Sequence, residues 1–180
     1  MTSNGLRCFV VATIFLSACG VKSDPSEGAK SPLGKGTTAK DFTTKDVDGQ
    51  TFRLSDHVGK SVILIDFWAT WCEPCLAEFP HLQTLYDQNK SKGFIVVAVS
   101  MDGPDSIAMV PAFVKRNGLT FPVVLDEDSR IASIYNPRKS APLSVLIDRA
   151  GHIVVVREGY NPGDDELIAA DVRRVLDAVE

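Results

Sequence analysis

The sequence predicts an α/β domain, built as a mixed sheet with helices on both faces. Segments 62–67 and 94–100 are nearly unbroken apolar runs rich in β-branched residues, typical of strands buried on both faces. Between them, an apolar stripe at helical spacing consists of Cys75, Phe79, Leu82 and Tyr86. Because a strand–helix–strand crossover is right-handed, the two strands should be parallel neighbours.

The other elements can be placed in order along the chain. Segments 41–44 and 51–54 flank Asp48-Gly49, which is a hairpin signal. After the crossover we expect a helix over 105–117, kinked or begun at Pro111, then a strand over 121–125 and a helix over 128–135. A second hairpin pairs 143–148 with 152–157, and a last helix covers about 164–178.

Composition limits the class of protein. The chain has 180 residues, of which 44% are hydrophobic and 23% charged, the balance of one soluble globular domain. The net charge is −4 and no block of lysine and arginine occurs, so no nucleic-acid partner is expected. Four cysteines are too few for a disulfide scaffold, and their positions are more informative than their number.

Residues 1–18 are predicted to be a lipoprotein signal peptide. Cys8 to Ala18 is an eleven-residue apolar run, too short to span a bilayer but suited to a signal peptide. The run ends in Leu16-Ser17-Ala18-Cys19, which resembles a bacterial lipobox, where the signal is cut before a cysteine that is then acylated. The alternative is an ordinary signal peptide in which Cys19 is incidental.

This interpretation divides the chain into three parts. After the signal, residues 19–39 are rich in Gly, Pro, Ser and Lys and form a flexible linker, anchored to the lipid membrane through Cys19. Residues 40–180 form the folded domain. The mature protein would be a membrane-anchored lipoprotein outside the cytoplasm, at the periplasmic face in a Gram-negative cell. The choice between inner and outer membrane stays open.

Trp71-Cys72-Glu73-Pro74-Cys75 connects the first buried strand to the first long helix. Two cysteines three positions apart at a helix start can form a disulfide after little movement. The unpaired N–H groups and the dipole of the helix favour a thiolate at Cys72, whereas Cys75 lies one turn in and should be more buried. We therefore expect Cys72 to attack a substrate sulfur and Cys75 to resolve the mixed disulfide. Pro74 fits the first turn, and Glu73 places a carboxylate that partly opposes the thiolate.

Half of a zinc site and an inert structural disulfide are the alternatives for this cysteine pair. A structural zinc ion takes about four ligands from the protein. Only His57, His81 and His152 remain as further candidates, and none of them forms a second ligand pair. We therefore expect no metal site and interpret the three histidines as surface residues.

Residues 66–75, Asp-Phe-Trp-Ala-Thr-Trp-Cys-Glu-Pro-Cys, resemble the active-site stretch of thioredoxins. The wider pattern is similar to the membrane-anchored TlpA/ResA branch, which has the Asp41-Phe42, Asp48-Gly49 and Leu54 hairpin before the core. That branch also inserts a helix and a strand in the middle of thioredoxin, here at about 105–125. The resemblance covers about 40–180. It implies a thioredoxin-like fold with an N-terminal β-hairpin and a central helix–strand insert, and it implies no cofactor.

The resemblance also implies roles outside the cysteine pair. Asp66 lies six residues before Cys72, the spacing of the buried thioredoxin aspartate, and would move protons to and from Cys75. The pKa of a carboxyl on an apolar strand should be raised, which suits that role. The alternative is an aspartate that reaches water at the strand end. Pro142 resembles the cis-proline that faces the cysteine pair and leaves the backbone of Ala141 free to pair with an extended substrate.

The remaining candidates concern substrate contact and the loop after the second strand. The expected substrate-binding residues are Trp71, Glu73, Pro74, Ala141 and Pro142. Trp68 is assigned to the core. Some relatives place a carboxylate near the end of the second strand, and Asp102 or Asp105 could fill that place, but the favoured interpretation is a solvated loop aspartate. Leu143 follows the proline where relatives usually have threonine, so the substrate groove should differ from theirs.

The function predicted on this basis is an extracytoplasmic thiol–disulfide oxidoreductase that reduces disulfides in exported proteins through the Cys72–Cys75 dithiol. By resemblance, apocytochrome c is one client, and a membrane electron donor is implied because nothing in the chain would reduce the pair. Three alternatives remain: a disulfide oxidase or isomerase of the same fold, a copper-delivery protein using the same two cysteines, and a peroxidase of the related peroxiredoxin group.

Overall fold

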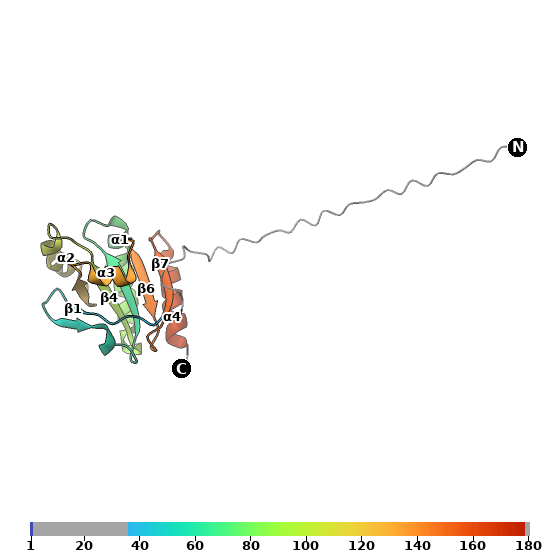
Figure 1. The fold of residues 1–180 in the computed structure, drawn as a ribbon, viewed down its shortest axis with the longest axis horizontal. Helices are drawn as coiled ribbons and strands as arrows, with labels where there is room; N and C mark the ends of the chain where they lie inside the picture. Colours follow the sequence, from blue (N-terminus) through green and yellow to red (C-terminus); the bar gives the residue numbers. More distant parts are fainter. Residues whose placement is uncertain (2–35, 179–180) are drawn as a thin grey trace.

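A computed structural model of the chain describes Met1 and residues 36–178. Its main sheet has five strands in the order β5-β4-β3-β6-β7 (Figure 1). The strands are β3 (Val62–Trp68), β4 (Phe94–Ser100), β5 (Val123–Leu125), β6 (Leu143–Ile147) and β7 (Ile153–Glu158). β3 pairs with β4 in parallel, as the crossover argument predicts, and with β6 antiparallel, so the sheet is mixed.

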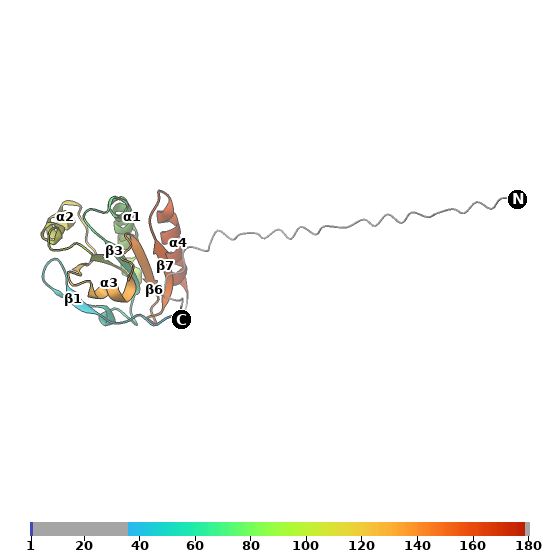
Figure 2. The same ribbon diagram turned by 45° about the horizontal axis from the view of Figure 1, so that its top comes forward.

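Two separate apolar clusters cover the two faces of this sheet. One face packs against α1 (Glu73–Asn89), α2 (Val110–Arg116) and α4 (Asp164–Asp177). The other face packs against α3 (Arg130–Tyr135) and the residues around a small antiparallel hairpin, β1 (Thr43–Lys45) and β2 (Thr51–Arg53). Figure 2 shows α3 and β1 in front of the sheet, with α1 and α4 behind it. The predicted helix–sheet–helix layering is therefore confirmed.

Short 3-10 helices complete the connections, at Leu54–Asp56, Lys90–Lys92 and Ile107–Met109. The sequence left open whether Pro111 kinks the helix expected over 105–117 or lies at its start. Pro111 lies in the first turn of α2, where a missing N–H breaks no helical hydrogen bond. The central insert is thus a 3-10 turn, a helix that begins at Val110 with this proline in its first turn, and β5.

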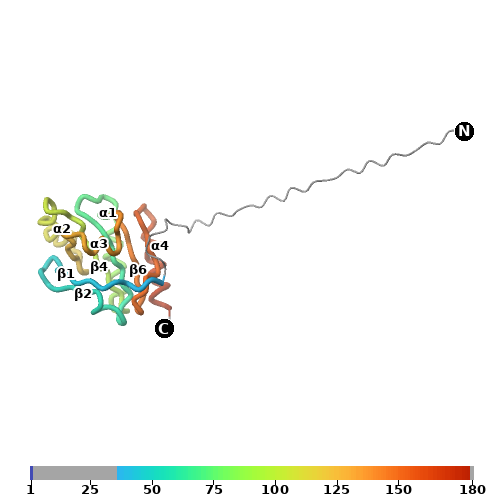
Figure 3. Tube along the Cα trace, viewed as in Figure 1, coloured from blue at the N-terminus to red at the C-terminus, as the bar shows by residue number. Residues whose placement is uncertain are grey.

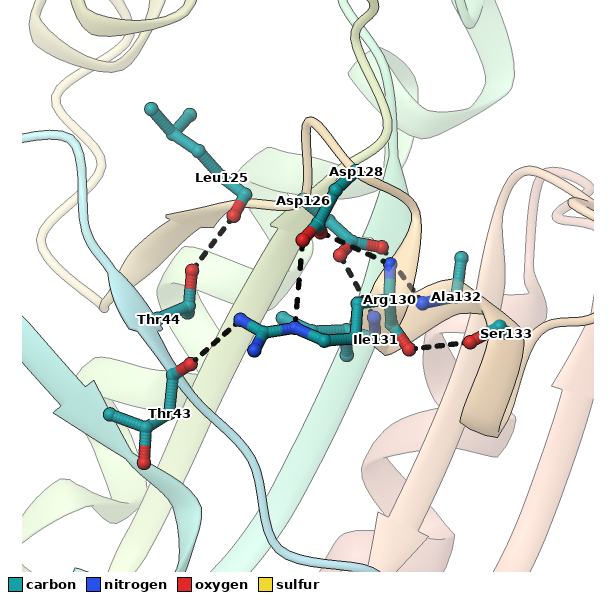
Figure 4. Close-up of polar contacts among 9 residues, drawn as sticks. All are labelled: Thr43, Thr44, Leu125, Asp126, Asp128, Arg130, Ile131, Ala132 and Ser133. Atoms are coloured by element: carbon teal, nitrogen blue, oxygen red, sulfur yellow. Dashed lines mark hydrogen bonds and ion pairs between the residues drawn. The ribbon is translucent and has the colours of Figure 1, made fainter.

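Polar contacts tie the hairpin to the far edge of the main sheet (Figure 4). The Thr44 hydroxyl donates to the backbone oxygen of Leu125 at 2.9 Å. The Arg130 guanidinium donates to the backbone oxygen of Thr43 at 3.1 Å. The hairpin therefore covers the sheet face as part of the domain and not as a free arm.

Asp126 links the end of β5 to the start of α3. Its carboxylate accepts hydrogen bonds from the backbone nitrogens of Ile131 and Ala132, each at 2.8 Å (Figure 4). Ser129, just before the helix, has a φ of +55° and no side-chain cap, so the aspartate supplies the acceptors that a capping side chain usually would. Asp126 is 4% exposed, which removes competing water from these bonds.

Residues 36–39, which the sequence placed in the linker, hydrogen-bond to the edge of the main sheet. Gly36 N donates to Ile153 O and Ala39 N donates to Gly151 O, both at 2.8 Å. In Figure 3 the blue segment that leads into β1 passes the orange strands at this edge. These four residues are therefore attached to the domain, ahead of the predicted boundary at residue 40.

The predicted signal peptide, Cys19 and the linker up to residue 35 lie outside the described residues. Across the part of the chain that the structure does describe, no helix combines the length and the apolar character needed to cross a bilayer.

We predict that Asp126→Ala lowers the free energy of unfolding by about 2 kcal/mol, because two buried N–H groups lose a charged acceptor. Asp128→Ala is the matched control, since Asp128 is exposed and its loss should cost less than about 0.5 kcal/mol. Urea unfolding of both variants measures the difference. Equal losses would show that Asp126 does not hold the start of α3.

Candidate active site

Cys72 and Cys75 form a disulfide at the junction of β3 and α1. Their sulfurs are 1.98 Å apart and their Cα atoms 5.3 Å apart. Because α1 begins at Glu73, Cys72 is its N-cap residue, and Pro74 lies in the first turn as predicted. The structure thus brings the two cysteines together at a helix N-terminus.

The two sulfurs differ in access and in contacts. Cys72 is 4% exposed, whereas Cys75 is fully buried. The Cys75 backbone nitrogen donates to the Cys72 sulfur at 3.3 Å, so the free N–H groups of the first turn point toward that sulfur. The same groups would stabilise a thiolate on Cys72 after the disulfide opens. This asymmetry supports Cys72 as the attacking thiol.

Asp102 holds the loop that carries the cysteine pair. It is 1% exposed and accepts hydrogen bonds from the Thr70 nitrogen at 3.0 Å, the Thr70 hydroxyl at 2.5 Å and the Ser100 hydroxyl at 2.9 Å. Burial alone would raise the pKa of Asp102, but these hydrogen bonds outweigh it and hold the pKa below its usual value. The buried position rules out a solvated loop aspartate at 102. Asp105 is exposed.

Asp66 lies in the middle of β3 with no exposed surface, so it does not reach water at the strand end. It sits between Leu64 and Trp68, whose side chains face α1, and by strand alternation it points the same way. Ser144, directly opposite on β6, donates to one of its oxygens at 3.1 Å, and the other oxygen has no partner among the described residues. Burial raises the pKa of Asp66 to about 7, against the opposing hydrogen bond from Ser144.

Glu78 is a second buried carboxyl, and the sequence analysis missed it. It lies three residues after Cys75 on α1 and is therefore on the same side of the helix. It is 1% exposed, and neither oxygen has a hydrogen-bond partner within the described part of the chain. Burial, with the nearby negative charges of Asp66 and Asp164, raises the pKa of Glu78 to about 9. The sequence did contain one indication of its burial, because Glu78 lies inside the apolar stripe between Cys75 and Leu82.

The predicted substrate-contacting residues lie on two segments beside the disulfide. Trp71 is 64% exposed, and Glu73 and Pro74 are exposed as well. The Ala141–Pro142 peptide is cis, as the sequence analysis expected. Ala141 packs against the large apolar cluster to which both cysteines belong.

Trp68, by contrast, is fully buried and belongs to the core, as predicted. Its ring packs edge-on against Phe79 with centroids 4.8 Å apart, and lies 5.1 Å from Phe113. It anchors the end of β3 between α1 and α2. His57, His81 and His152 are all at least partly exposed, in keeping with their assignment to the surface.

Comparison with known proteins decides the family. Residues 35–156 match the AhpC/TSA family. The thiol-disulfide oxidoreductase ResA of Bacillus subtilis is 41% identical over 154 residues, covering 86% of this chain and 79% of that protein. ResA of Geobacillus kaustophilus is 35% identical over 151 residues, covering 84% and 81%. The chain belongs to the ResA-like thiol-disulfide oxidoreductases.

Solved structures agree with the ResA-like assignment. A putative thiol:disulfide interchange protein DsbE from Chlorobium tepidum superposes with a TM-score of 0.74 at 35% identity, covering 80% of this chain and 99% of that one. A putative thioredoxin from Neisseria meningitidis gives a TM-score of 0.66 at 32% identity, covering 80% and 95%. The predicted thioredoxin-like fold is confirmed.

A ResA-like oxidoreductase moves two electrons through its cysteine pair. In the reducing direction, a Cys72 thiolate would attack one sulfur of a substrate disulfide, and the other substrate sulfur would leave as a thiolate that takes up a proton. Cys75 would then give up its proton and attack the Cys72 sulfur, releasing the second substrate thiol. Run this way, the exchange would reduce the substrate and leave the chain as the disulfide described here. Asp66 and Glu78 lie on the Cys75 side of the sheet, where a proton acceptor is needed.

We predict that Glu78→Gln flattens the pH dependence of stability in the oxidised protein between pH 7 and 9. With its pKa raised to about 9, the folded chain holds the Glu78 proton more tightly than the unfolded chain does. That stabilisation is complete below the ordinary pKa of a glutamate and is lost as the pH rises toward 9, by up to about 1.4 kcal/mol per pH unit. Urea unfolding at several pH values gives the slope.

The matched control is Glu73→Gln, which removes an exposed carboxyl from the same helix. It should leave the slope between pH 7 and 9 unchanged. If both variants kept the slope of the parent chain, the buried glutamate would not hold its proton as described.

Proposed function

We propose that this chain is a membrane-anchored, extracytoplasmic reductant of disulfides in exported proteins. Electrons would enter from a membrane donor, pass through Cys72 and Cys75, and leave to a client such as apocytochrome c. The thiol–disulfide exchange belongs to the family; the direction, the location and the client are the proposed parts.

The direction rests on the buried carboxyl of Asp66, which faces α1 from the middle of β3. A disulfide is a strong oxidant when its reduced form is stabilised. Because burial raises the pKa of Asp66 to about 7, this carboxyl ionises near neutral pH and adds negative charge on the side of the sheet where a thiolate would form, whereas Glu78, with its pKa raised to about 9, stays neutral there. An ionised carboxylate disfavours that thiolate and so shifts the equilibrium toward the disulfide, which makes the dithiol a better reductant.

Anchoring through Cys19 would leave the cysteine pair accessible, because the chain enters the domain at the opposite end. Residues 36–39 pair with the turn before β7, beside the amino-terminal end of β3. The disulfide lies past the other end of this seven-residue strand, about 20 Å away at roughly 3.3 Å per residue. An anchor that precedes residue 36 would therefore leave the cysteine pair at the end of the domain away from the point of entry.

The surface beside the disulfide supports a protein client. An extended segment could pair with the backbone at Ala141 while an apolar side chain contacts the exposed ring of Trp71. The disulfide exposes very little surface, since Cys72 is only 4% exposed and Cys75 is fully buried. A client would thus bind over the disulfide and not within a deep cleft.

The midpoint potential of the Cys72–Cys75 pair tests the direction. In a chain with Cys8 and Cys19 replaced by serine, so that only this pair titrates, we expect a value near that of thioredoxin, about −270 mV. Equilibration with glutathione or dithiothreitol redox buffers gives the number. A value above about −180 mV would identify an oxidase or isomerase and overturn the proposed direction.

Fractionation of bacterial cells expressing the chain tests the anchor. We expect the parent chain in the membrane fraction and Cys19→Ser in the soluble fraction, because the lipid would have no sulfur to attach to. Cys8→Ser is the matched control and should stay with the membrane, since residue 8 would leave with the signal. Membrane association of the Cys19 variant would contradict lipid anchoring.

A further inference from the structure

The loop of residues 136–141 leads from α3 to β6, at the end of the sheet from which the chain continues to the cysteine pair. β6 begins at Leu143, which pairs with Phe67 near the end of β3, and β3 runs on from there toward Cys72. The middle of this loop is exposed, whereas Asn136 at its start is only 1% exposed. A buried polar side chain therefore lies at the base of an otherwise exposed loop.

The side-chain amide of Asn136 binds both backbone groups of Ser140. Its oxygen accepts a hydrogen bond from the Ser140 nitrogen at 2.9 Å, and its nitrogen donates to the Ser140 carbonyl oxygen at 2.7 Å. A side-chain amide can do this because it carries a donor and an acceptor side by side. Asn136 therefore fixes the backbone immediately before Ala141.

The backbone of Ala141 is open, whereas the residues on either side of it are bonded. Asn136 holds Ser140, and the Pro142 carbonyl oxygen accepts a hydrogen bond from the Gly159 nitrogen at 2.8 Å. Within residues 36–178, neither the N–H nor the carbonyl oxygen of Ala141 takes part in a hydrogen bond. Since backbone polar groups in a half-buried place need partners, Ala141 is where an extended client segment can pair.

The bond from Asn136 to the Ser140 carbonyl also sets the direction of the Ala141 N–H. That carbonyl and that N–H belong to the same planar peptide unit, in which they point in opposite directions. When the Asn136 nitrogen holds the oxygen, the N–H of Ala141 is directed away from Asn136. The orientation of the free donor thus depends on a buried side chain five residues earlier.

The end of β4 contacts both this loop and the loop that carries the cysteines. The Asn136 amide nitrogen lies 3.4 Å from the Met101 sulfur, and the Met101 nitrogen donates to the Trp68 carbonyl oxygen at 2.8 Å. The next residue, Asp102, accepts hydrogen bonds from Thr70. The position of Asn136 is therefore tied to the same segment that holds the approach to Cys72.

We propose that Asn136 is a positioning residue of the exchange reaction: its side-chain amide aims the open backbone of Ala141 at the client segment. Asn136 touches neither the sulfurs nor the client, and it acts through Ser140. The inference rests on the client surface proposed above at Ala141, and not on the direction of electron flow.

Single-turnover reduction of a peptide mixed disulfide tests this role. The full-length chain, with Cys8 and Cys19 replaced by serine, is first reduced. Its Cys72 thiolate attacks the sulfur of a cysteine peptide bonded to thionitrobenzoate, which leaves with the electron pair of that bond. Cys75 then gives up its proton and attacks Cys72, and the peptide leaves as a thiolate that takes up a proton. Coloured thionitrobenzoate, followed at rising peptide concentration, gives the limiting rate and the half-saturating concentration.

We expect Asn136→Leu to raise the half-saturating peptide concentration about tenfold and to leave the limiting rate unchanged, because only client pairing is lost. Asn136→Ala, a smaller side chain, is a second variant with the same expectation. The mixed disulfide of mercaptoethanol with thionitrobenzoate has no peptide backbone. It should react at the parent rate in both variants, which also shows that both are folded.

Peptides N-methylated at each residue in turn report backbone pairing directly. In the parent chain, methylation of the residue that donates to the Ala141 carbonyl should raise the half-saturating concentration about tenfold. In the Asn136 variants the same methylation should cost less than about twofold, because the pairing is already lost. A general loss of stability would not produce this dependence of one change on the other.

Asn89→Leu is the matched control. Asn89 is also buried, at 5% exposure, and its side-chain nitrogen donates to the Leu85 carbonyl oxygen at 2.9 Å, but it lies at the far end of α1 from Cys72. This variant should keep the parent half-saturating concentration and the parent sensitivity to methylation.

Parent-like peptide kinetics in the Asn136 variants would overturn the positioning role. So would an equal loss of rate with the mercaptoethanol disulfide, which would show that Asn136 supports the cysteine site itself. If methylation at no peptide position affected the parent chain, the client surface at Ala141 would be wrong, and the role of Asn136 with it. The direction of electron flow would stand apart from that result, since the midpoint potential tests it.

Discussion

Strand β3 is hydrogen-bonded along both edges, and the chemistry of the domain depends on that pairing. β4 and β6 fix its register, so Asp66 stands opposite Ser144 and its side chain faces α1. The carboxyl end of β3 then delivers the chain to the start of α1, with the intervening loop held by Asp102 from the next strand's end. Cys72 is thereby placed as the N-cap residue of α1. A shift of β3 by one residue would turn Asp66 to the other face and leave the cysteines without it.

Two opposing electrostatic effects meet at the cysteine pair. The start of α1 favours a thiolate by about 0.3–1 kcal/mol, and up to about 2 in partly buried geometry. The buried carboxyls oppose it, and each tenfold change in the equilibrium corresponds to about 30 mV for this two-electron couple. Thioredoxin and DsbA differ by about 150 mV, or roughly 7 kcal/mol. No single neighbour spans that range, so the potential reflects several groups around the cysteine pair together.

Local patterns in the sequence were enough for the element order, the parallel crossover and the cysteine pair, and the resemblance to thioredoxins implied the cis peptide before Pro142. The features that were missed depend on contacts between distant segments. Glu78 resembles an ordinary polar helix position until α4, some ninety residues later, packs over it. Asp102 resembles a solvated loop residue because its partner Thr70 is 32 positions away. The burial of Glu78 and of Asp102 could not be predicted for the same reason. Burial depends on tertiary packing, whereas hydrophobic periodicity indicates only which face of a single helix or strand is apolar.

An unpartnered buried carboxyl costs stability, so its presence beside the disulfide needs a physical account. A neutral, protonated Glu78 avoids the much larger cost of a buried charge, and this is the form that its surroundings favour while the cysteines are bonded. When the disulfide opens, Cys75 becomes a buried thiolate next to a carboxyl that holds a proton. Transfer of that proton would leave a neutral thiol at Cys75 and move the single negative charge to the carboxylate of Glu78. The pair of Cys75 and Glu78 thus carries a single negative charge on either side of the transfer, whereas an ionised Glu78 beside a thiolate would place two charges in the same buried region.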